Sequence, residues 1–195
     1  DYSKFGYLQS TVKATDYQLV KTDLQEQYSV LPQARINYSS YEKNNDFKYK
    51  FSGELSVFDH TYASKATGTR VTLYPSVEYP MKNIGWEVIP KIGVKHRTYS
   101  LSGSSDNSIT DTTPIFSLRG KMVFDKMQGK NILQTLEPEI YLLYVPASNQ
   151  DSIPIFDAGE NDLKYNLFSE NKFYGEDRLN DAKQMTLALP SSITD

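Results

Sequence analysis

The sequence lacks cysteine altogether, and it lacks both a surplus of one charge and a long apolar run. Among its 195 residues, 21 are Lys or Arg and 24 are Asp or Glu, so the formal net charge is −3. Without cysteine the chain holds no disulfide, thiolate zinc site or cysteine nucleophile, and the near balance of charge argues against a nucleic-acid-binding protein. No segment reaches the roughly 18–20 apolar residues of a membrane-spanning helix. A membrane protein built of strands stays open, because strands that alternate in polarity average out as hydrophilic.

The dominant pattern is a strict alternation of apolar and polar residues, which is typical of strands with one apolar and one wet face. Most of these segments run for ten residues or more. That is longer than the five or six residues usual in soluble strands and matches the roughly 9–11 residues of a tilted membrane strand. The pattern predicts an all-β fold, an antiparallel transmembrane β-barrel with eight strands in this chain. The predicted strands are 5–18, 29–41, 47–59, 69–80, 86–100, 114–125, 132–145 and 183–189.

The predicted connections alternate in length along the chain. The short ones are 42–46, 81–85 and 126–131, and the longer ones are 19–28, 60–68, 101–113 and 146–182. Outer-membrane barrels have short turns at the periplasmic rim and long loops at the extracellular rim. We therefore expect short periplasmic turns and long extracellular loops, with 146–182 as the longest loop.

Alternation also predicts which side chains share a face. Apolar residues expected to point into lipid are Tyr49, Phe51, Leu55, Val57, Val71, Leu73, Val77, Val88, Ile92 and Val94. Polar residues expected to point into the lumen are Lys48, Lys50, Glu54, Arg70, Glu78, Glu87, Lys91, Lys95, Arg119, Lys121, Glu137 and Glu139.

Residue patterns that carry catalytic or metal chemistry are absent. His60 and His96 are far apart and have no second metal ligand at a recognisable spacing. Glu137 and Glu139 are close enough for acid–base work, yet they fit better as lining of a polar lumen. The run from Asp157 to Asp162 does not match the spacing of an EF-hand. We predict no catalytic residue, no metal site and no cofactor, and hence no enzyme.

The last third of the chain carries ordered motifs that resemble a known family. Thr135-Leu-Glu-Pro-Glu-Ile-Tyr-Leu-Leu-Tyr-Val-Pro146 is followed by Ile153-Pro-Ile-Phe-Asp157, Asn171-Lys-Phe-Tyr-Gly175 and Asp177-Arg-Leu-Asn-Asp-Ala182. This succession resembles the barrel region of the LptD family, the lipopolysaccharide-assembly proteins of the Gram-negative outer membrane. Upstream, Thr67-Gly-Thr-Arg-Val-Thr-Leu-Tyr-Pro75 and Val88-Ile-Pro-Lys-Ile-Gly-Val94 resemble preceding strands of the same barrel.

The resemblance implies that residues 1–195 are a section of a much larger barrel that passes lipopolysaccharide into the outer leaflet. It implies as partners lipopolysaccharide, the plug lipoprotein LptE, the periplasmic bridge protein LptA, the outer-membrane bilayer and, during folding, the barrel-assembly machinery. Eight strands closed on themselves would have a lumen filled by side chains. We therefore interpret the chain as an internal section, without the lateral gate.

Within the loop 146–182, the family motifs single out residues that brace the loop or contact lipopolysaccharide. Phe168 and Phe173 are expected to anchor the loop by burial, and Arg178 is expected to pair with its aspartates. The motif residues are Asp157, Asp162, Phe168, Asn171, Phe173, Gly175, Asp177, Arg178, Asp181 and Gln184.

Two alternatives stay open at this point. A complete small outer-membrane barrel, acting as an adhesin or structural protein, fits the loop lengths but not the motifs of 135–189. A soluble β-sandwich or lipocalin-like binding module fits the mean hydropathy of −0.55, but it would need shorter strands.

Overall fold

The computed structural model describes residues 6–16, 27–42, 44–62, 64–102, 108–128, 132–160 and 167–194. Fourteen strands are assigned in these ranges. They are β1 Tyr7–Thr15, β2 Ser29–Ser39, β3 Lys48–Asp59, β4 Thr67–Glu78, β5 Met81–Asn83, β6 Trp86–Ser102, β7 Ser108–Met122, β8 Phe124–Gln128, β9 Ile132–Leu136, β10 Glu139–Val145, β11 Gly159–Glu160, β12 Phe173–Tyr174, β13 Ala182–Ala188 and β14 Ser191–Thr194.

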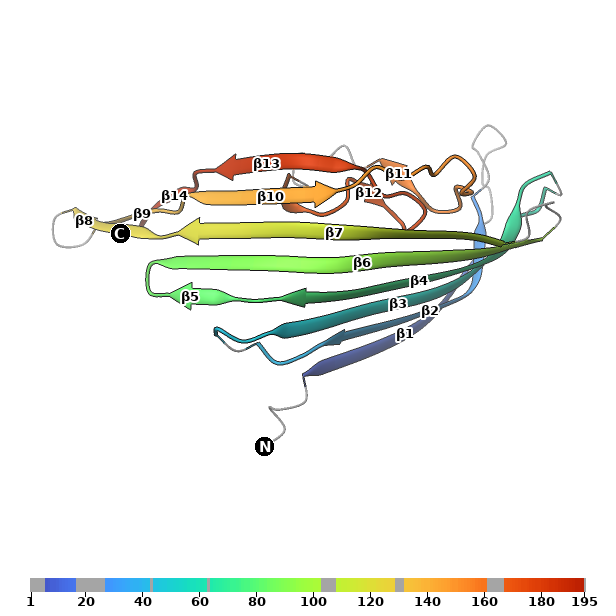
Figure 1. Cartoon of the computed structure of the whole chain (residues 1–195), viewed down its shortest axis with the longest axis horizontal. Coiled ribbons are helices and arrows are strands. Elements are labelled where there is room, and N and C mark those ends of the chain that lie inside the picture. The colour runs from blue at the N-terminus through green and yellow to red at the C-terminus, as the bar shows by residue number, and fades with distance from the viewer. Residues whose placement is uncertain are drawn as a thin grey trace.

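Nine of these strands form one antiparallel sheet, the main sheet. Its order is β1-β2-β3-β4-β6-β7-β10-β13, with the short β5 pairing β6. The strands follow one another across the sheet in chain order, with the short strands β5, β8, β9, β11 and β12 lying in the connections, so the main sheet is a meander (Figure 1). In the described residues β1 and β13 form its two edges and do not pair with each other. An open meander of long strands confirms the predicted all-β section of a larger barrel.

The strand lengths confirm the long strands that the sequence predicts where alternation is strongest. β3 and β4 each have 12 residues and β6 has 17, so several strands exceed the five or six residues usual in soluble sheets. Within the described residues, no helix is long and apolar enough to cross a membrane.

Several predicted boundaries are wrong. The expected short connection 81–85 contains β5, and the expected strand 114–125 is divided between β7 and β8, with β8 running into the expected turn 126–131. The expected loop 101–113 is mostly strand, because β6 continues to Ser102 and β7 starts at Ser108. This extension is stabilised by pairing, with Arg97 opposite Asp111. Residues 103–107 lie outside the described residues.

The predicted strand 132–145 is also divided in two. Pro138 separates β9 from β10, and Pro190 similarly separates β13 from β14, because proline has no backbone N–H for the ladder. Beyond this break, β14, β9 and β8 form a separate three-stranded sheet, which projects past the turn between β5 and β6 (Figure 1).

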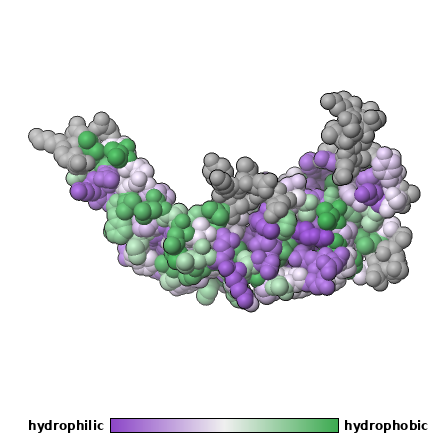
Figure 2. All heavy atoms as spheres, turned by 90° about the horizontal axis from the view of Figure 1, so that it is seen from above, coloured by the Kyte–Doolittle hydropathy of each residue, from purple (hydrophilic) through white to green (hydrophobic). Residues whose placement is uncertain are grey.

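The connection between β10 and β13 folds back over one face of the main sheet. It contains the two-stranded pair β11–β12, which lies beside the ends of β10 and β13 in Figure 1. Viewed from above, hydrophilic surface gathers toward the end where β11 and β12 lie, and more hydrophobic surface toward the end with β8, β9 and β14 (Figure 2). We term the face that contacts this connection the loop face and the opposite one the bare face.

Candidate functional site

The loop face carries the predicted lumenal residues. Because alternate residues of a strand share a face and paired residues of neighbouring strands point the same way, eleven of the twelve lie on it. Glu137 is the exception, because it lies in the link between β9 and β10 and not in a strand of the main sheet.

These charged residues meet opposite charges from neighbouring strands or from the loop. Ion pairs join Lys48 to Glu42, Lys50 to Glu78, Glu54 to Arg35 and Arg70, Glu87 to Lys82, Lys91 to Glu170, Lys95 to Glu176, Arg119 to Glu139 and Lys121 to Glu137. The loop face is thus strongly polar with little net charge.

Arg70 in β4 is the main attachment point of the loop. Its side chain is fully buried. Nη1 donates to Asp157 Oδ1 at 2.7 Å and to Asp177 Oδ1 at 2.6 Å, and Nη2 donates to Asp157 Oδ2 at 2.6 Å. Nη2 also donates to Glu54 Oε1 at 2.7 Å. One guanidinium therefore joins two strands to two points of the loop that lie 87 and 107 residues further along the chain.

Asp177 completes this attachment from the loop side. Its Oδ2 accepts backbone N–H groups of Phe156 at 2.6 Å and Asp157 at 2.8 Å. Its Oδ1 also accepts the Tyr99 hydroxyl at 3.1 Å. Asp177 thereby holds residues 156–157 in the position where Asp157 reaches Arg70.

The pKa values of the two loop carboxylates, Asp157 and Asp177, are shifted in opposite directions. Burial raises the pKa of Asp157, but hydrogen bonds and attraction from Arg70 lower it more, so its pKa lies below the usual 3.8. Burial and the negative charge of Asp157 raise the pKa of Asp177 above 3.8. Two neighbouring carboxylates that share one arginine titrate as a coupled pair.

Arg97 in β6 forms a second attachment, which the sequence analysis did not single out. It is fully buried and pairs with Asp111 in β7 at 2.5 Å. Nη1 donates to the Asp177 carbonyl at 2.8 Å, and Nη2 donates to Gln150 Oε1 at 3.2 Å. The signal was present, because Arg97 continues the face of Lys91 and Lys95 at a spacing of two.

Two apolar clusters pack the loop against the sheet. One contains Phe58, Tyr99, Ile153 and Phe156, and the rings of Phe58 and Phe156 stack with centroids 4.4 Å apart. The other contains Ile115, Tyr141, Leu143, Val145 and Leu179. Because loop residues are buried in both clusters, the loop is part of the folded core rather than a free extension.

The predicted motif residues divide by role. Phe168 packs against the second cluster, with its ring centroid 6.0 Å from Tyr141. Phe173 is half-buried in β12 and belongs to neither cluster. Asp181 is exposed, and Asp162 lies outside the described residues.

Other motif residues hold the backbone of the loop. Asn171 Nδ2 donates to the Arg178 carbonyl at 2.8 Å, and Gln184 Nε2 donates to the Leu167 carbonyl at 2.8 Å. Gly175 has a φ of 72°, and a Cβ there would lie 2.4 Å from the Asp157 carbonyl oxygen, so no other residue fits without strain.

Within the part of the loop that the structure describes, Arg178 donates to backbone carbonyls rather than pairing with aspartates as expected. Its Nη2 donates to the Ile153 carbonyl at 2.8 Å and its Nη1 to the Asp177 carbonyl at 3.2 Å. Asp157 and Asp177 accept hydrogen bonds from Arg70 instead.

A cavity of about 520 Å³ lies on the loop face nearer the short turns. Lys50, Lys91 and Arg119 line it from the sheet, and Phe168 and Glu170 line it from the loop. Glu170 accepts the Tyr74 hydroxyl at 2.5 Å and pairs with Lys91 at 2.9 Å. Among the described residues, no group of three His, Cys, Asp or Glu side chains could hold a metal ion.

The bare face carries the apolar half of the alternation. The ten residues predicted to face lipid all lie on it. Large apolar side chains are strongly exposed there, including Leu55 at 40%, Ile92 at 49% and Leu187 at 67%. Exposed apolar area of this extent marks a surface that meets another apolar phase.

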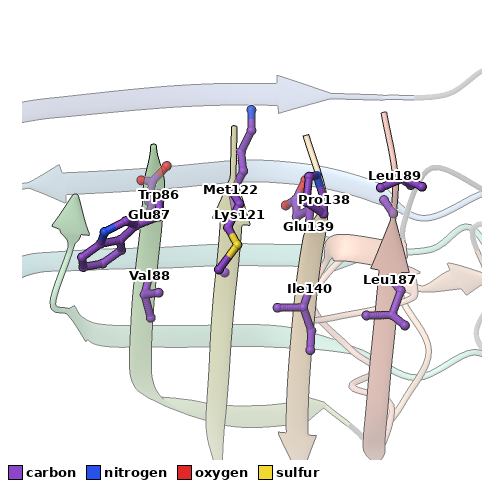
Figure 3. Close-up of a pocket in the computed structure, with 12 residues that line it drawn as sticks. Trp86, Glu87, Val88, Lys121, Met122, Pro138, Glu139, Ile140, Leu187 and Leu189 are labelled. Carbon is purple, nitrogen blue, oxygen red and sulfur yellow. The ribbon is translucent and has the colours of Figure 1, made fainter. Parts of the chain in front are cut away.

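An apolar groove of about 760 Å³ crosses the ends of β6, β7, β10 and β13. Figure 3 shows Val88, Met122, Ile140 and Leu187 projecting into this region from adjacent strands. Trp86 also lines this groove, and Trp is enriched where a lipid phase meets water.

A long-stranded antiparallel sheet with a bare apolar face and a charged face that holds a packed loop defines a section of a transmembrane β-barrel. The family model "LptD: LPS transport system D" matches residues 1–195. The chain belongs to the LptD family, which is a family of outer-membrane transport proteins rather than enzymes.

Individual relatives agree with this assignment. The chain is 40% identical over 179 residues to the LPS-assembly protein LptD of Aromatoleum aromaticum, covering 88% of this chain and 23% of the relative. It is 39% identical to that of Thiobacillus denitrificans, covering 87% and 24%. It is 32% identical to that of Methylococcus capsulatus, covering 100% and 20%. The chain thus spans a fifth to a quarter of the length of these relatives.

Proposed function

We propose that this chain is a wall section of a barrel that transports lipopolysaccharide into the outer leaflet of the outer membrane. The observation that carries the proposal is the contrast between the two faces, with exposed apolar side chains on one and paired charges on the other. In this arrangement the bare face contacts the bilayer and the loop face lines a hydrated lumen. Family membership supplies the transported molecule.

The loop face suits the passage of a hydrated saccharide. Its charges are paired with one another, so neither sign is in excess to hold a charged group of the substrate. The partners proposed for the whole protein are lipopolysaccharide, the plug lipoprotein LptE within the lumen, the bridge protein LptA at the periplasmic side, and the barrel-assembly machinery.

The connection 146–182 is proposed to lie at the extracellular end and to narrow the lumen there. Arg70, Arg97 and the two apolar clusters hold it against the barrel wall. The motif residues Phe168, Asn171, Asp177 and Gln184 then act as braces, because their side chains are engaged within the loop or with the wall.

The two alternatives find less support. A complete small barrel requires its first and last strands to pair, whereas the edges β1 and β13 remain unpaired in the described part of the chain. A soluble sandwich requires a second layer over the bare face, yet Leu55 and Ile92 are exposed there.

The facing is tested by Leu55→Arg in the full-length protein, with Leu55→Met as the control. An arginine at a lipid-facing site near the bilayer midplane costs roughly 2–4 kcal/mol. We expect fewer folded barrels and less lipopolysaccharide at the surface of cells depleted of the wild-type protein. Normal assembly and transport by the arginine variant would contradict the proposed facing.

Sidedness is tested by single cysteines at Ser152 and Ile84, both exposed, in a full-length protein otherwise without reactive thiols. A membrane-impermeant maleimide on intact cells should label Ser152→Cys, whereas Ile84→Cys should react only after permeabilisation. The opposite pattern would mean that the loop is periplasmic.

A further inference from the structure

A second polar cavity lies away from the charged one, where the connections of the proposed extracellular end meet. It has a volume of about 500 Å³. Residues from three separate segments line it, namely Tyr28, His60, Lys65, Phe156, Asp157 and Tyr174. Nothing in the transport role described above uses this cavity.

Aromatic rings form a firm base for the cavity. The Tyr28 ring meets Phe156 edge-on with centroids 5.0 Å apart and His60 at 4.8 Å. Phe156 in turn stacks on the buried Phe58. Because Phe58 and Phe156 belong to the buried cluster beneath, the base cannot move without disrupting the attachment of the loop.

Hydrogen-bonding groups of several kinds surround this base. The backbone N–H of Tyr62 donates to His60 Nδ1 at 3.0 Å, which leaves Nε2 of the ring to meet a ligand. Lys65 contributes an exposed ammonium group. The Asp157 side chain pairs with Arg70 but keeps 27% of its surface exposed, and it lines the cavity with carboxylate oxygens that can accept a further hydrogen bond.

Tyr174 is held in place by the pairing of β11 with β12. It lies opposite Gly159, and a Cβ on Gly159 would lie 2.0 Å from the Tyr174 hydroxyl oxygen. The ring therefore lies across the glycine, and Tyr174 lines the cavity. The residue is otherwise 59% exposed.

We propose that this cavity binds a saccharide unit. A sugar ring presents an apolar C–H face that suits an aromatic surface, and a rim of hydroxyls that needs both donors and acceptors. The cavity supplies both kinds of contact, whereas an acyl chain would leave its polar groups unsatisfied. The inference rests on the proposed function, in which the saccharide of lipopolysaccharide leaves the lumen at this end.

The test measures binding of lipid-free core oligosaccharide, released from lipopolysaccharide by mild acid hydrolysis of the bond to lipid A, to the detergent-solubilised full-length protein with its plug lipoprotein. Tyr174→Ala removes an exposed ring and should leave the fold intact. Tyr41→Ala removes an equally exposed tyrosine at the opposite end of the sheet, with 62% exposure against 59%. We expect Tyr174→Ala to weaken binding at least about tenfold, the scale of losing one well-packed aromatic contact, and Tyr41→Ala to leave it unchanged.

Several outcomes would overturn the inference. They are no binding of the oligosaccharide by the wild-type protein, equal weakening by both tyrosine variants, or binding of acylated lipopolysaccharide alone. Surface lipopolysaccharide measured in cells expressing the same variants separates this inference from the proposed function. Normal transport without oligosaccharide binding refutes only the cavity assignment, whereas absence of transport by the wild-type protein refutes the function on which it rests.

Discussion

Replacing Arg70 with methionine should release the loop 146–182 from the barrel wall. The guanidinium donates four hydrogen bonds to three carboxylates, and the side chains of Glu54 and Asp177 are 4% and 0% exposed. Removing one partner of a buried ion pair costs about 3–5 kcal/mol, because the remaining charge is left uncompensated. Arg119→Met is the matched control, since Arg119 pairs with Glu139 while 46% exposed, and such a pair is worth about 0–1 kcal/mol.

Trypsin cleavage after Arg178 reports the opening of the loop. In the folded loop the Arg178 side chain donates to the Ile153 carbonyl, and its own carbonyl accepts from Asn171, so the protease needs local unfolding. A cost of 3–5 kcal/mol raises the open population by about a hundredfold or more, given tenfold for each 1.4 kcal/mol. We expect rapid cleavage of Arg70→Met in the assembled full-length protein and cleavage near the wild-type rate for Arg119→Met.

A second variant distinguishes release of the loop from misfolding of the whole protein. Adding Asp157→Asn and Asp177→Asn to Arg70→Met removes two of the uncompensated charges and should restore part of the protection. The reasoning is refuted if Arg70→Met is as protected as the wild type, or if both arginine variants are cleaved equally fast.

Three further perturbations test neighbouring features of the loop and of the short turns. Phe156→Ala should destabilise the loop by about 3–5 kcal/mol. Ile155 is 57% exposed, so Ile155→Ala should leave the protection of the loop from protease nearly unchanged. Equal effects of the two variants would contradict the described packing. Gly175→Ala should lower the unfolding temperature, because φ is 72° and a left-handed conformation costs about 1–2 kcal/mol. Gly85→Ala should be tolerated, because the new Cβ would have its nearest neighbour at 3.7 Å. Hydrogen bonds from two lysines lower the pKa of Glu42 to about 2. The stability that Glu42 contributes is therefore present above its ordinary pKa of 4.5 and is lost as the pH falls toward 2. Glu42→Gln should make the unfolding free energy less dependent on pH in this window, and an unchanged pH profile would show that the pairing contributes nothing.

The sequence alone predicted how polar and apolar side chains divide between the two faces of the sheet. From Tyr49 to Val57 in β3 and from Val71 to Val77 in β4 every second residue is non-polar, and a period of two leaves only one way to divide such a strand between two environments. The resemblance of 135–189 to one family was likewise present in the order of motifs. For these reasons the fold class, the long strands and the division of Lys50 and Leu55 between opposite faces needed no coordinates.

What only the tertiary structure decided is which residues meet across long distances in sequence. Periodicity places Arg70 on a face but does not say that Asp157 and Asp177 come back to it, because contacts made by loop closure leave no local pattern. For the same reason, periodicity did not show that Arg178 donates to the Ile153 carbonyl. Arg97 was overlooked although its spacing from Lys91 and Lys95 places it on the same face. The extension of β6 and β7 through the expected loop 101–113 depends on cross-strand pairing, such as that of Arg97 with Asp111, which stabilises polar residues in a strand only once the partner strand is in place.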